Sequence, residues 1–262
     1  LAKAASVSLG CKFQRIQCTP DLLPSDVTGV QFYDQRTGIF TFRPGPLMSN
    51  VVLVDEINRA TPRTQSALLE AMQERQVTVD VETVPLPRPF MLLATQNPVE
   101  LEGTFPLPEA QLDRFLLRLR MGYPTSEQEG EILSRFQEED PLSGVSSVAD
   151  AGELIVLQDV CRRVYVAPPV RDYIVALVRG TRDDVDVKLG ASPRASLGLQ
   201  RAAQALAAVR GRAYVLPDDV KYVAVAVLAH RLIVKTEARL RGRTAEAMVQ
   251  ELLGSVPVPV EE

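Results

Sequence analysis

Histidine is almost absent from this chain, which contains one, His230, among its 262 residues. A single imidazole cannot supply the ligands of a histidine-rich zinc site. His230 also lies within the apolar stretch VAVAVLAHRLIV, where we expect a satisfied position in or near the core. The sequence therefore argues against such a zinc site and against a Ser-His-Asp triad of the ordinary type.

Cysteine is scarce as well. Cys11, Cys18 and Cys161 are the three in the chain, and their spacing contains no C-x-x-C motif. An odd, scattered set fits a reducing compartment better than a disulfide framework. We expect each thiol to behave as a small buried apolar residue.

Long apolar runs are missing too. None approaches the ~20 residues that a transmembrane helix needs. The opening stretch LAKAASVSLG lacks the combined charged, apolar and cleavage regions of a signal peptide. We therefore expect a cytoplasmic protein with no membrane insertion.

The charge balance is mild, with 29 basic and 33 acidic residues and a net charge of −4. This balance gives no support to a nucleic-acid coat or to an anionic membrane surface as the partner. A chain of this length with 46% hydrophobic residues can form one large domain or two smaller ones.

The first part of the chain alternates between strand and helix patterns. Strands are predicted at 12–18, 51–55 and 90–95, and Thr61 is predicted to cap a helix. Two further stretches, near 30–43 and 76–90, have the composition of hairpins, and FLLRLRM at 115–121 predicts another strand. This alternation indicates an α/β layer with parallel strands.

After GYP at 122–124 the pattern becomes almost entirely helical. The first helix there begins with Ser126 and Glu129 in the spacing of a capping box. We therefore place a domain boundary near 122–125. It divides the chain into an α/β core, residues 1–123, and an α-helical domain, residues 124–262.

Two adjacent carboxylates, Asp55 and Glu56, follow the predicted strand in VVLVDEINRA. A core strand that ends in a polar turn is one explanation. A nucleotide site is the other, because ligands of parallel α/β sheets bind outside the carboxyl ends of the strands. An Asp there can hold Mg²⁺ through water, and a neighbouring Glu can activate a water for attack on a phosphate.

A second strand end repeats this arrangement in FMLLATQN, which places Asn97 after the strand. If the two strands are neighbours, the Asn97 amide lies near the carboxylates and can orient a water without adding charge. A loop Asn before Pro98 is the plainer alternative.

Two arginines suit the same chemistry. Arg114 lies in QLDRF and Arg194 in GASPRAS, at the predicted start of a helix. Guanidinium groups stabilise the charge of a transferring phosphoryl group, and one of them can come from a neighbouring subunit. Ordinary surface arginines are the alternative.

These motifs together resemble a known family. The stretches VVLVDEINRATPRTQSALLEAMQERQVTV, PLPRPFMLLATQNPVELEGTFPLPEAQLDRFL, GASPRAS and CTPDLLPSDVTG resemble the MoxR family of AAA+ ATPases over essentially the whole chain. The resemblance implies an α/β parallel-sheet nucleotide domain with β-hairpin inserts, followed by a helical lid domain, assembled as a ring that is usually hexameric. The hairpins would be the helix-2 insert and the pre-sensor-1 insert.

The resemblance also implies a role for each matched residue. Asp55 and Glu56 would be the Walker B pair, with Asp55 holding Mg²⁺ through water, and Asn97 would be sensor 1. Arg114 would be the arginine finger and Arg194 the sensor 2 arginine. The implied cofactors are ATP and Mg²⁺.

The implied function is ATP hydrolysis that drives chaperone-like maturation of protein complexes or metal-cofactor insertion. The implied partners are further copies of the chain in the ring and proteins with a von Willebrand factor A domain. No residue identifies the client protein.

One family motif is missing, since G-x-x-x-x-G-K-[ST] occurs nowhere in the 262 residues. In the family this Walker A loop immediately precedes the helix with which the chain begins, and that helix has no capping residue of its own. We therefore expect that Leu1 is not the natural start. The missing loop keeps a nucleotide-free interaction scaffold open as an alternative. A DNA-handling AAA+ motor is a further alternative function, and the net negative charge of the chain argues against it.

Overall fold

The computed structural model describes residues 1–80, 82–97, 103–138 and 140–259. They form two compact units, each described by itself below. The first unit comprises Leu1–Leu107 and Gly122–Val156, and the second comprises Pro108–Met121 and Leu157–Glu262. The boundary between residues 123 and 124 stays a prediction about the domains.

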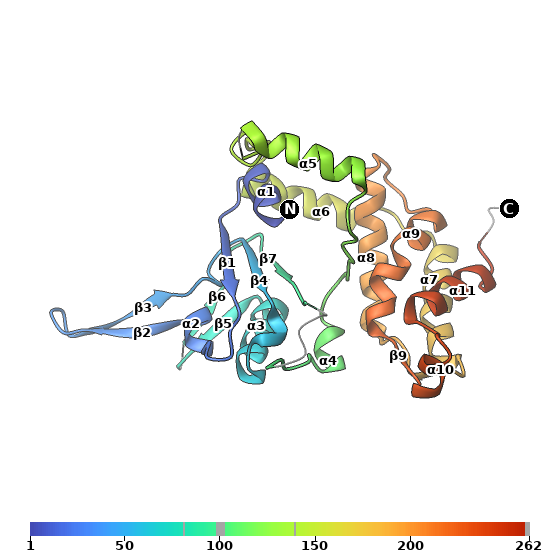
Figure 1. The fold of residues 1–262 in the computed structure, drawn as a ribbon, viewed down its shortest axis with the longest axis horizontal. Coiled ribbons are helices and arrows are strands. Elements are labelled where there is room, and N and C mark those ends of the chain that lie inside the picture. Colours follow the sequence, from blue (N-terminus) through green and yellow to red (C-terminus); the bar gives the residue numbers. More distant parts are fainter. Residues whose placement is uncertain (81, 98–102, 139, 260–262) are drawn as a thin grey trace. The chain divides into compact units, whose positions relative to one another are not determined.

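The first unit is built on a three-stranded parallel sheet (Figure 1). Its strands in spatial order are β1 (Phe13–Gln17), β4 (Val51–Asp55) and β7 (Met91–Ala94). The aliphatic strand β4 lies in the middle, and Val52 and Val54 are fully buried. Near-continuous aliphatic strands are typical of parallel sheets. The predicted α/β layer is therefore confirmed.

Two helices of this unit have ends that carry clear sequence signals. α1 (Ala2–Ser8) is followed by Gly10, whose φ of 58° lies in the left-handed region that glycine tolerates after a helix. α3 (Pro62–Glu74) begins after Thr61, whose hydroxyl accepts from the Thr64 N–H at 3.4 Å. Both ends agree with the sequence signals for helix termination and capping.

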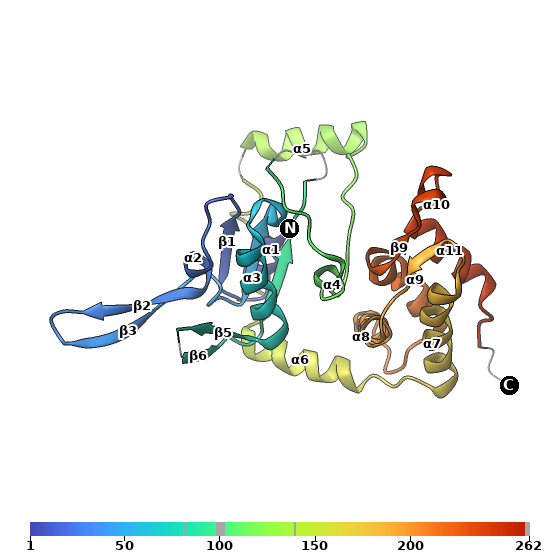
Figure 2. The same ribbon diagram turned by 90° about the horizontal axis from the view of Figure 1, so that it is seen from below.

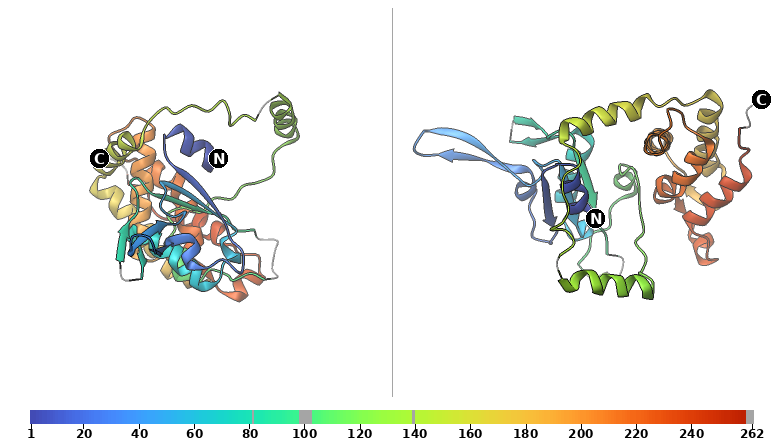
Figure 3. Two further views of the ribbon diagram at one scale, coloured as in Figure 1. Left: turned by 90° about the vertical axis from the view of Figure 1, so that its left-hand side faces the viewer. Right: turned by 90° about the horizontal axis from the view of Figure 1, so that it is seen from above.

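Two antiparallel hairpins also belong to the first unit, as predicted. β2 (Gly29–Asp34) pairs with β3 (Ile39–Pro44), and β5 (Gln76–Val79) pairs with β6 (Glu82–Pro85). The short helix α2 (Pro24–Thr28) leads into β2. The β2–β3 hairpin projects away from the parallel sheet (Figure 3).

The two hairpins are joined by a hydrogen bond, in which Gln31 Nε2 donates to Glu82 Oε2 at 2.8 Å. Exposed aromatic side chains lie along the β2–β3 hairpin. The rings of Tyr33 and Phe40 pack across the two strands with centroids 5.0 Å apart. Cross-strand aromatic pairs of this kind stabilise a hairpin.

α5 (Ser126–Glu138) has its capping box one residue earlier than predicted. The Thr125 hydroxyl accepts from the Gln128 N–H at 3.3 Å, and Gln128 Oε1 accepts from the Thr125 N–H at 2.9 Å. Because Gln can replace Glu in this motif, the reciprocal pair is Thr125 and Gln128. α6 (Ala151–Arg163) follows and contributes residues to both units.

The second unit is mainly helical (Figure 2). Its core lies between four helices: α7 (Pro168–Asp183), α8 (Pro193–Val209), α9 (Pro217–Leu228) and α11 (Ala245–Ser255). Buried alanines on α8 let α9 pack closely against it. The predicted helical character of this part of the chain is confirmed.

Shorter elements complete the second unit. They are α4 (Glu109–Leu112), η2 (Ala229–Arg231), α10 (Thr236–Leu240), and the antiparallel pair β8 (Val187–Leu189) and β9 (Ile233–Val234). The sequence did not predict the β8–β9 pair, because strands this short carry no readable alternation.

The strand predicted at 115–121 is wrong, since these described residues form no strand. The segment instead lies against η2 and α9. The Arg118 N–H donates to the carbonyl of Ala226 at 2.9 Å, and the carbonyls of Phe115 and Leu116 accept from Arg231. The Arg231 side chain thus binds backbone carbonyls that, in a strand, would bind a neighbouring strand.

None of the helices in the described part of the chain combines the length and the apolar character that crossing a membrane takes.

Candidate functional site

The candidate site of the first unit begins where β4 ends, at Asp55. β1 and β7 flank β4, so the polar residues that follow these parallel strands gather at one edge. Asp55 Oδ1 accepts from the Thr95 hydroxyl at 2.5 Å, and Oδ2 accepts from Arg15 Nε at 3.1 Å and from Arg15 Nη2. The Thr95 bond and then the Arg15 bond hold the pKa of the Asp55 carboxyl below its usual range. Asp55 is therefore ionised at neutral pH.

Glu56 occupies an unusual backbone conformation. Its φ of 55° and ψ of 51° are left-handed, which is uncommon for a residue with a Cβ. The conformation turns the chain from β4 into η1 (Ile57–Arg59). Strained backbone of this kind concentrates at functional sites, where the surrounding structure holds it in place.

The Glu56 side chain is held on two sides. Its Oε2 accepts from Gln17 Nε2 at 2.9 Å and from Arg59 Nη1 at 3.2 Å. Its backbone N–H donates to the Thr95 hydroxyl at 2.9 Å. The carboxylate is still 22% exposed, so a water molecule can reach it.

A buried glutamine fixes the turn that follows. Gln65 of α3 is fully buried, and its Nε2 donates to the carbonyls of Ile57, Ala60 and Phe105 at 2.9 to 3.2 Å. One amide group thereby satisfies backbone acceptors from two segments. This contact stabilises the turn that carries Glu56.

Cys18 lies directly behind the carboxylates. Its N–H donates to the carbonyl of Asp55 at 3.0 Å, and the residue is fully buried. Burial, with a further contribution from the negative charges of Asp55 and Glu56, raises the pKa of its thiol to about 11. Cys18 is therefore a neutral packing residue, in agreement with the sequence prediction.

Asn97 lies beyond the end of β7 and is half-buried. The chain that leads to it is bound to the turn after β4, since Thr95 accepts from the Ile57 N–H at 3.0 Å with its carbonyl and from the Glu56 N–H at 2.9 Å with its hydroxyl. The strand ends carrying Asp55, Glu56 and Asn97 are thus brought together, as their order in the sequence predicts.

The donor set at this edge suits Mg²⁺. Two carboxylates with exposed fractions of 23% and 22%, beside a hydroxyl, are hard oxygen ligands. In the described ranges no group of three or more His, Cys, Asp or Glu side chains could hold a metal by itself. Mg²⁺ needs no such group, because it keeps several waters and binds phosphate oxygens.

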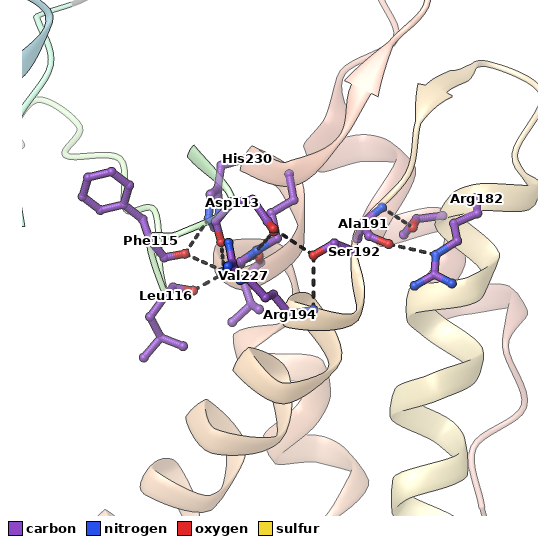
Figure 4. A network of polar contacts seen from close by, with 11 residues as sticks. Asp113, Phe115, Leu116, Arg182, Ala191, Ser192, Arg194, Val227 and His230 are labelled. Carbon is purple, nitrogen blue, oxygen red and sulfur yellow. Dashed lines mark hydrogen bonds and ion pairs between the residues drawn. The ribbon is translucent and has the colours of Figure 1, made fainter. Parts of the chain in front are cut away.

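Arg114 and Arg194 belong to the second unit. Both are exposed, and among the described residues their guanidinium groups have no hydrogen bond or ion pair. The residues beside them are joined, since the Ser192 hydroxyl donates to Asp113 Oδ2 at 2.8 Å and accepts from the Arg194 N–H at 3.2 Å (Figure 4). The structure therefore brings QLDRF and GASPRAS together within one unit.

Sequence reasoning missed two residues of the site, Arg15 and Gln17. They bind Asp55 and Glu56, and Arg15 Nη2 also donates to Gln17 Oε1 at 2.6 Å. Their polar, alternating positions on β1 were visible in the sequence. Only the parallel register, which places Gln17 beside Asp55, assigns them to the carboxylates.

Comparison with known families agrees with this fold and site. Residues 1–117 match the AAA model described as an ATPase family associated with various cellular activities, and residues 179–252 match an AAA lid domain. These two matches define the class as an AAA-type ATPase core with its lid.

Individual relatives give the family. The uncharacterized protein YeaC of Bacillus subtilis is 51% identical over 261 residues, which cover 100% of this chain and 82% of YeaC. Chaperone MoxR1 of Mycobacterium tuberculosis is 44% identical over 260 residues, which cover 96% of this chain and 68% of MoxR1. A crystal structure of a candidate ATPase from Cytophaga hutchinsonii superposes with a TM-score of 0.91 at 39% identity, covering 98% of this chain and 81% of that one. The chain belongs to the MoxR family of AAA+ ATPases.

Family membership confirms both the resemblance seen in the motifs and the predicted fold class of an AAA+ core with a helical lid. It makes the protein an ATPase-type enzyme of a nucleotide-binding class. The roles of the individual residues are a separate matter.

Proposed function

We propose that this protein hydrolyses ATP with Mg²⁺ and uses the energy for chaperone-like maturation of protein complexes or metal-cofactor insertion. The main support is the end of β4, where an ionised Asp55 and a Glu56 in left-handed backbone lie side by side. The surrounding structure holds Glu56 in this backbone conformation, since its N–H donates to the Thr95 hydroxyl that also binds Asp55.

Each residue of the first unit has a distinct task in this proposal. Asp55 holds Mg²⁺ through water, and the metal neutralises charge on the phosphates. Glu56 orients and deprotonates the attacking water, for which its partly exposed carboxylate is suited. Asn97 positions the same water with a neutral amide.

The arginines of the second unit complete the proposed site. Arg114 reaches the γ-phosphate of a nucleotide bound by a neighbouring subunit, and Arg194 senses the nucleotide from the lid. The exposed guanidinium group of Arg114 supports this role, because an arginine that acts on the nucleotide of another subunit must be accessible to that subunit. The guanidinium group of Arg194 is likewise exposed and accessible to a nucleotide. The proposed assembly is a ring, expected to be hexameric, and the proposed location is the cytoplasm.

The proposed partners follow from the family. Proteins with a von Willebrand factor A domain are expected to link the ring to its client. The chaperone name of MoxR1 supports a chaperone-like role. The proposed domain division stays at residues 1–123 and 124–262.

The deciding experiment is the substitution Glu56→Gln in the full-length protein. The amide keeps the shape of the side chain but cannot accept the proton of the attacking water, so ATP binding should persist while phosphate release falls by about 10²-fold or more. Binding of a fluorescent ATP analogue and phosphate release measure the two steps. Glu70→Gln, at an exposed position of α3, is the matched control and should behave as wild type.

Three outcomes would contradict the proposal. Wild-type turnover by Glu56→Gln would remove Glu56 from the chemistry. Failure of the full-length wild type to bind ATP would favour a nucleotide-free scaffold. DNA binding that weakens steeply with salt would instead favour the DNA-handling motor.

A further inference from the structure

Arg231 is a buried cation whose hydrogen bonds are all satisfied. Its side chain is 3% exposed. Nε donates to Asp113 Oδ1, Nη1 to the carbonyls of Leu116 and Val227, and Nη2 to the carbonyls of Asp113 and Phe115. A guanidinium group has five N–H donors, and each of them here has an acceptor.

Four of these acceptors come from residues 113–116, which surround Arg114 on both sides. This described stretch follows α4 and forms neither helix nor strand, and the backbone N–H groups of residues 113–115 donate back to carbonyls of α4. His230 adds a bond from Nε2 to the Phe115 carbonyl at 3.1 Å. The backbone on either side of Arg114 is therefore held from two directions: α4 binds its N–H groups, and the side chains of η2 bind its carbonyls.

α8 is joined to the same network. The second oxygen of Asp113 accepts from the hydroxyl of Ser192, which caps α8 two residues before Arg194 (Figure 4). α8 also lies close to this stretch, since a Cβ on Gly198 would come within 3.4 Å of Leu116 Cδ1. Asp113 thus connects the stretch that carries Arg114 to the helix that carries Arg194.

The loop before α8 is fixed from its other side. Arg182 Nε donates to the carbonyl of Ala191 at 2.9 Å, and the Thr181 hydroxyl accepts from the Ala191 N–H at 3.0 Å (Figure 4). The start of α8 therefore has little freedom to move independently of η2 and α7.

Stability alone is a poor explanation for the buried cation. A well-packed apolar replacement for a buried ion pair is often neutral or stabilising, because desolvation of the charges offsets their attraction. What five directed bonds supply, and apolar packing does not, is one defined conformation of the backbone that they bind.

We infer that Arg231 is a positioning residue for ATP hydrolysis, which fixes Arg114 and, through Asp113 and Ser192, Arg194 as one rigid pair. The inference rests on the proposed function, because it presumes that these two arginines act on nucleotide. Its consequence is that the two arginines cannot change position independently. A shift of α8 on nucleotide binding moves Arg114 as well. It therefore changes the position of Arg114 relative to the nucleotide of the neighbouring subunit.

The test is a double-mutant cycle in the full-length protein with Arg231→Lys and Arg114→Ala. Lysine keeps the charge but has three donors at one point, so it cannot bind five separated acceptors. We expect kcat to fall by about 10²-fold with KM almost unchanged, as for a misplaced catalytic group. For Arg114→Ala we expect kcat to fall by on the order of 10³-fold.

The double variant separates positioning from general damage. If Arg231 acts through Arg114, the loss caused by Arg231→Lys is much smaller in the Arg114→Ala background, and what remains is the part that acts through Arg194. Arg212→Lys is the matched control, because Arg212 binds the fully buried Asp219 in the same unit and touches none of residues 113–116. It should lower the melting temperature and leave kcat as in wild type.

Several outcomes would overturn the inference. These are wild-type turnover by Arg231→Lys, losses that multiply in the double variant, or an equal loss in Arg212→Lys. If Arg231→Lys does not fold, a cycle of Ser192→Ala with Arg194→Ala replaces it, with an expected loss in kcat of about 10-fold that disappears in the Arg194→Ala background.

The proposed function is tested separately in the same assay. Normal hydrolysis by Glu56→Gln, or none by wild type, contradicts the proposed function. Hydrolysis that depends on Glu56 and Arg114 but is indifferent to Arg231 overturns only the positioning role.

Discussion

The hydroxyl of Thr95 connects the Asp55 carboxylate to the backbone of Glu56. That hydroxyl donates to Asp55 Oδ1 and accepts from the Glu56 N–H. A hydroxyl can do both at once, which a carboxylate or an amide nitrogen cannot. The ionisation of Asp55 and the backbone of Glu56 therefore depend on the same side chain.

Replacing Thr95 by valine should change the pH dependence of hydrolysis. The Thr95 bond is the largest cause of the lowered pKa of Asp55, so its loss raises that pKa toward the ordinary carboxyl value. The acid limb of the rate profile in full-length protein then moves to higher pH. Stability near neutral pH should also fall, because a group with a depressed pKa stabilises the fold above its unfolded pKa.

Thr95→Ser is the matched control for this prediction, since it keeps the hydroxyl and loses only a methyl group. Its rate profile should coincide with that of wild type. Identical profiles for the valine and serine variants would show that the hydroxyl does not set the ionisation of Asp55.

At the scale of elements, the sequence predicted the helices and strands whose type and ends are encoded by nearby residues. β4 and α3 were readable from an aliphatic run and from Thr61 as a cap, and the pair Asp55 and Glu56 followed directly from β4. Gln17 was not readable, because its role depends on how β1 aligns with β4.

The error at 115–121 has the same origin. An apolar alternating segment is equally suited to a strand and to a stretch laid on helices. In the structure the segment is bound by Arg231 and by the carbonyl of Ala226, both more than a hundred residues away in sequence. Local propensity cannot predict a contact between residues so far apart in the sequence.

η2 provides a pH-dependent contribution to stability through His230. Burial, with the positive charge of Arg231, lowers its pKa to about 4. The unfolded chain binds a proton near pH 6.5 and the folded chain does not, so stability falls as pH drops. From about pH 7 to pH 5.5 the loss should be about 1 kcal/mol.

His230→Gln should remove this part of the pH dependence, because glutamine keeps an N–H for the Phe115 carbonyl and does not titrate. Since His230 is the single histidine of the chain, the difference in urea midpoint between the two proteins isolates its contribution. A difference that does not change with pH would contradict the assignment of a neutral, buried imidazole.

The β2–β3 hairpin depends on a glycine at its base. Gly29 has a φ of 102°, and a Cβ there would lie 2.4 Å from the carbonyl oxygen of Arg43. Gly29→Ala should therefore open the hairpin and make it sensitive to proteases. Gly38→Ala, where the nearest atom is 3.9 Å away, meets backbone strain of about 1 kcal/mol and no clash. Equal protease resistance of the two variants would contradict this prediction.

At the scale of the whole molecule, the proposed site residues are divided between the two units. Asp55, Glu56 and Asn97 belong to one, and Arg114 and Arg194 to the other. In the proposed ring, each site takes Glu56 from one subunit and Arg114 from the next.

Mixing two inactive variants should therefore restore activity. When Glu56→Gln and Arg114→Ala subunits assemble at random in equal amounts, roughly a quarter of the interfaces combine an intact Glu56 with an intact Arg114. Phosphate release from the mixture should rise accordingly, whereas each variant alone stays inactive. A mixture that remains inactive would place both residues in the same subunit's site.

The three thiols differ in accessibility in a way that is useful for spectroscopy. Cys11 and Cys18 are buried, and Cys18 is in addition held neutral, while Cys161 on α6 is partly exposed. Because alkylation requires an accessible thiolate, a maleimide dye should attach at Cys161 in preference to the other two. The chain also contains no tryptophan, so such a dye, paired with one introduced indole, would give an optical reporter with no background from the rest of the sequence.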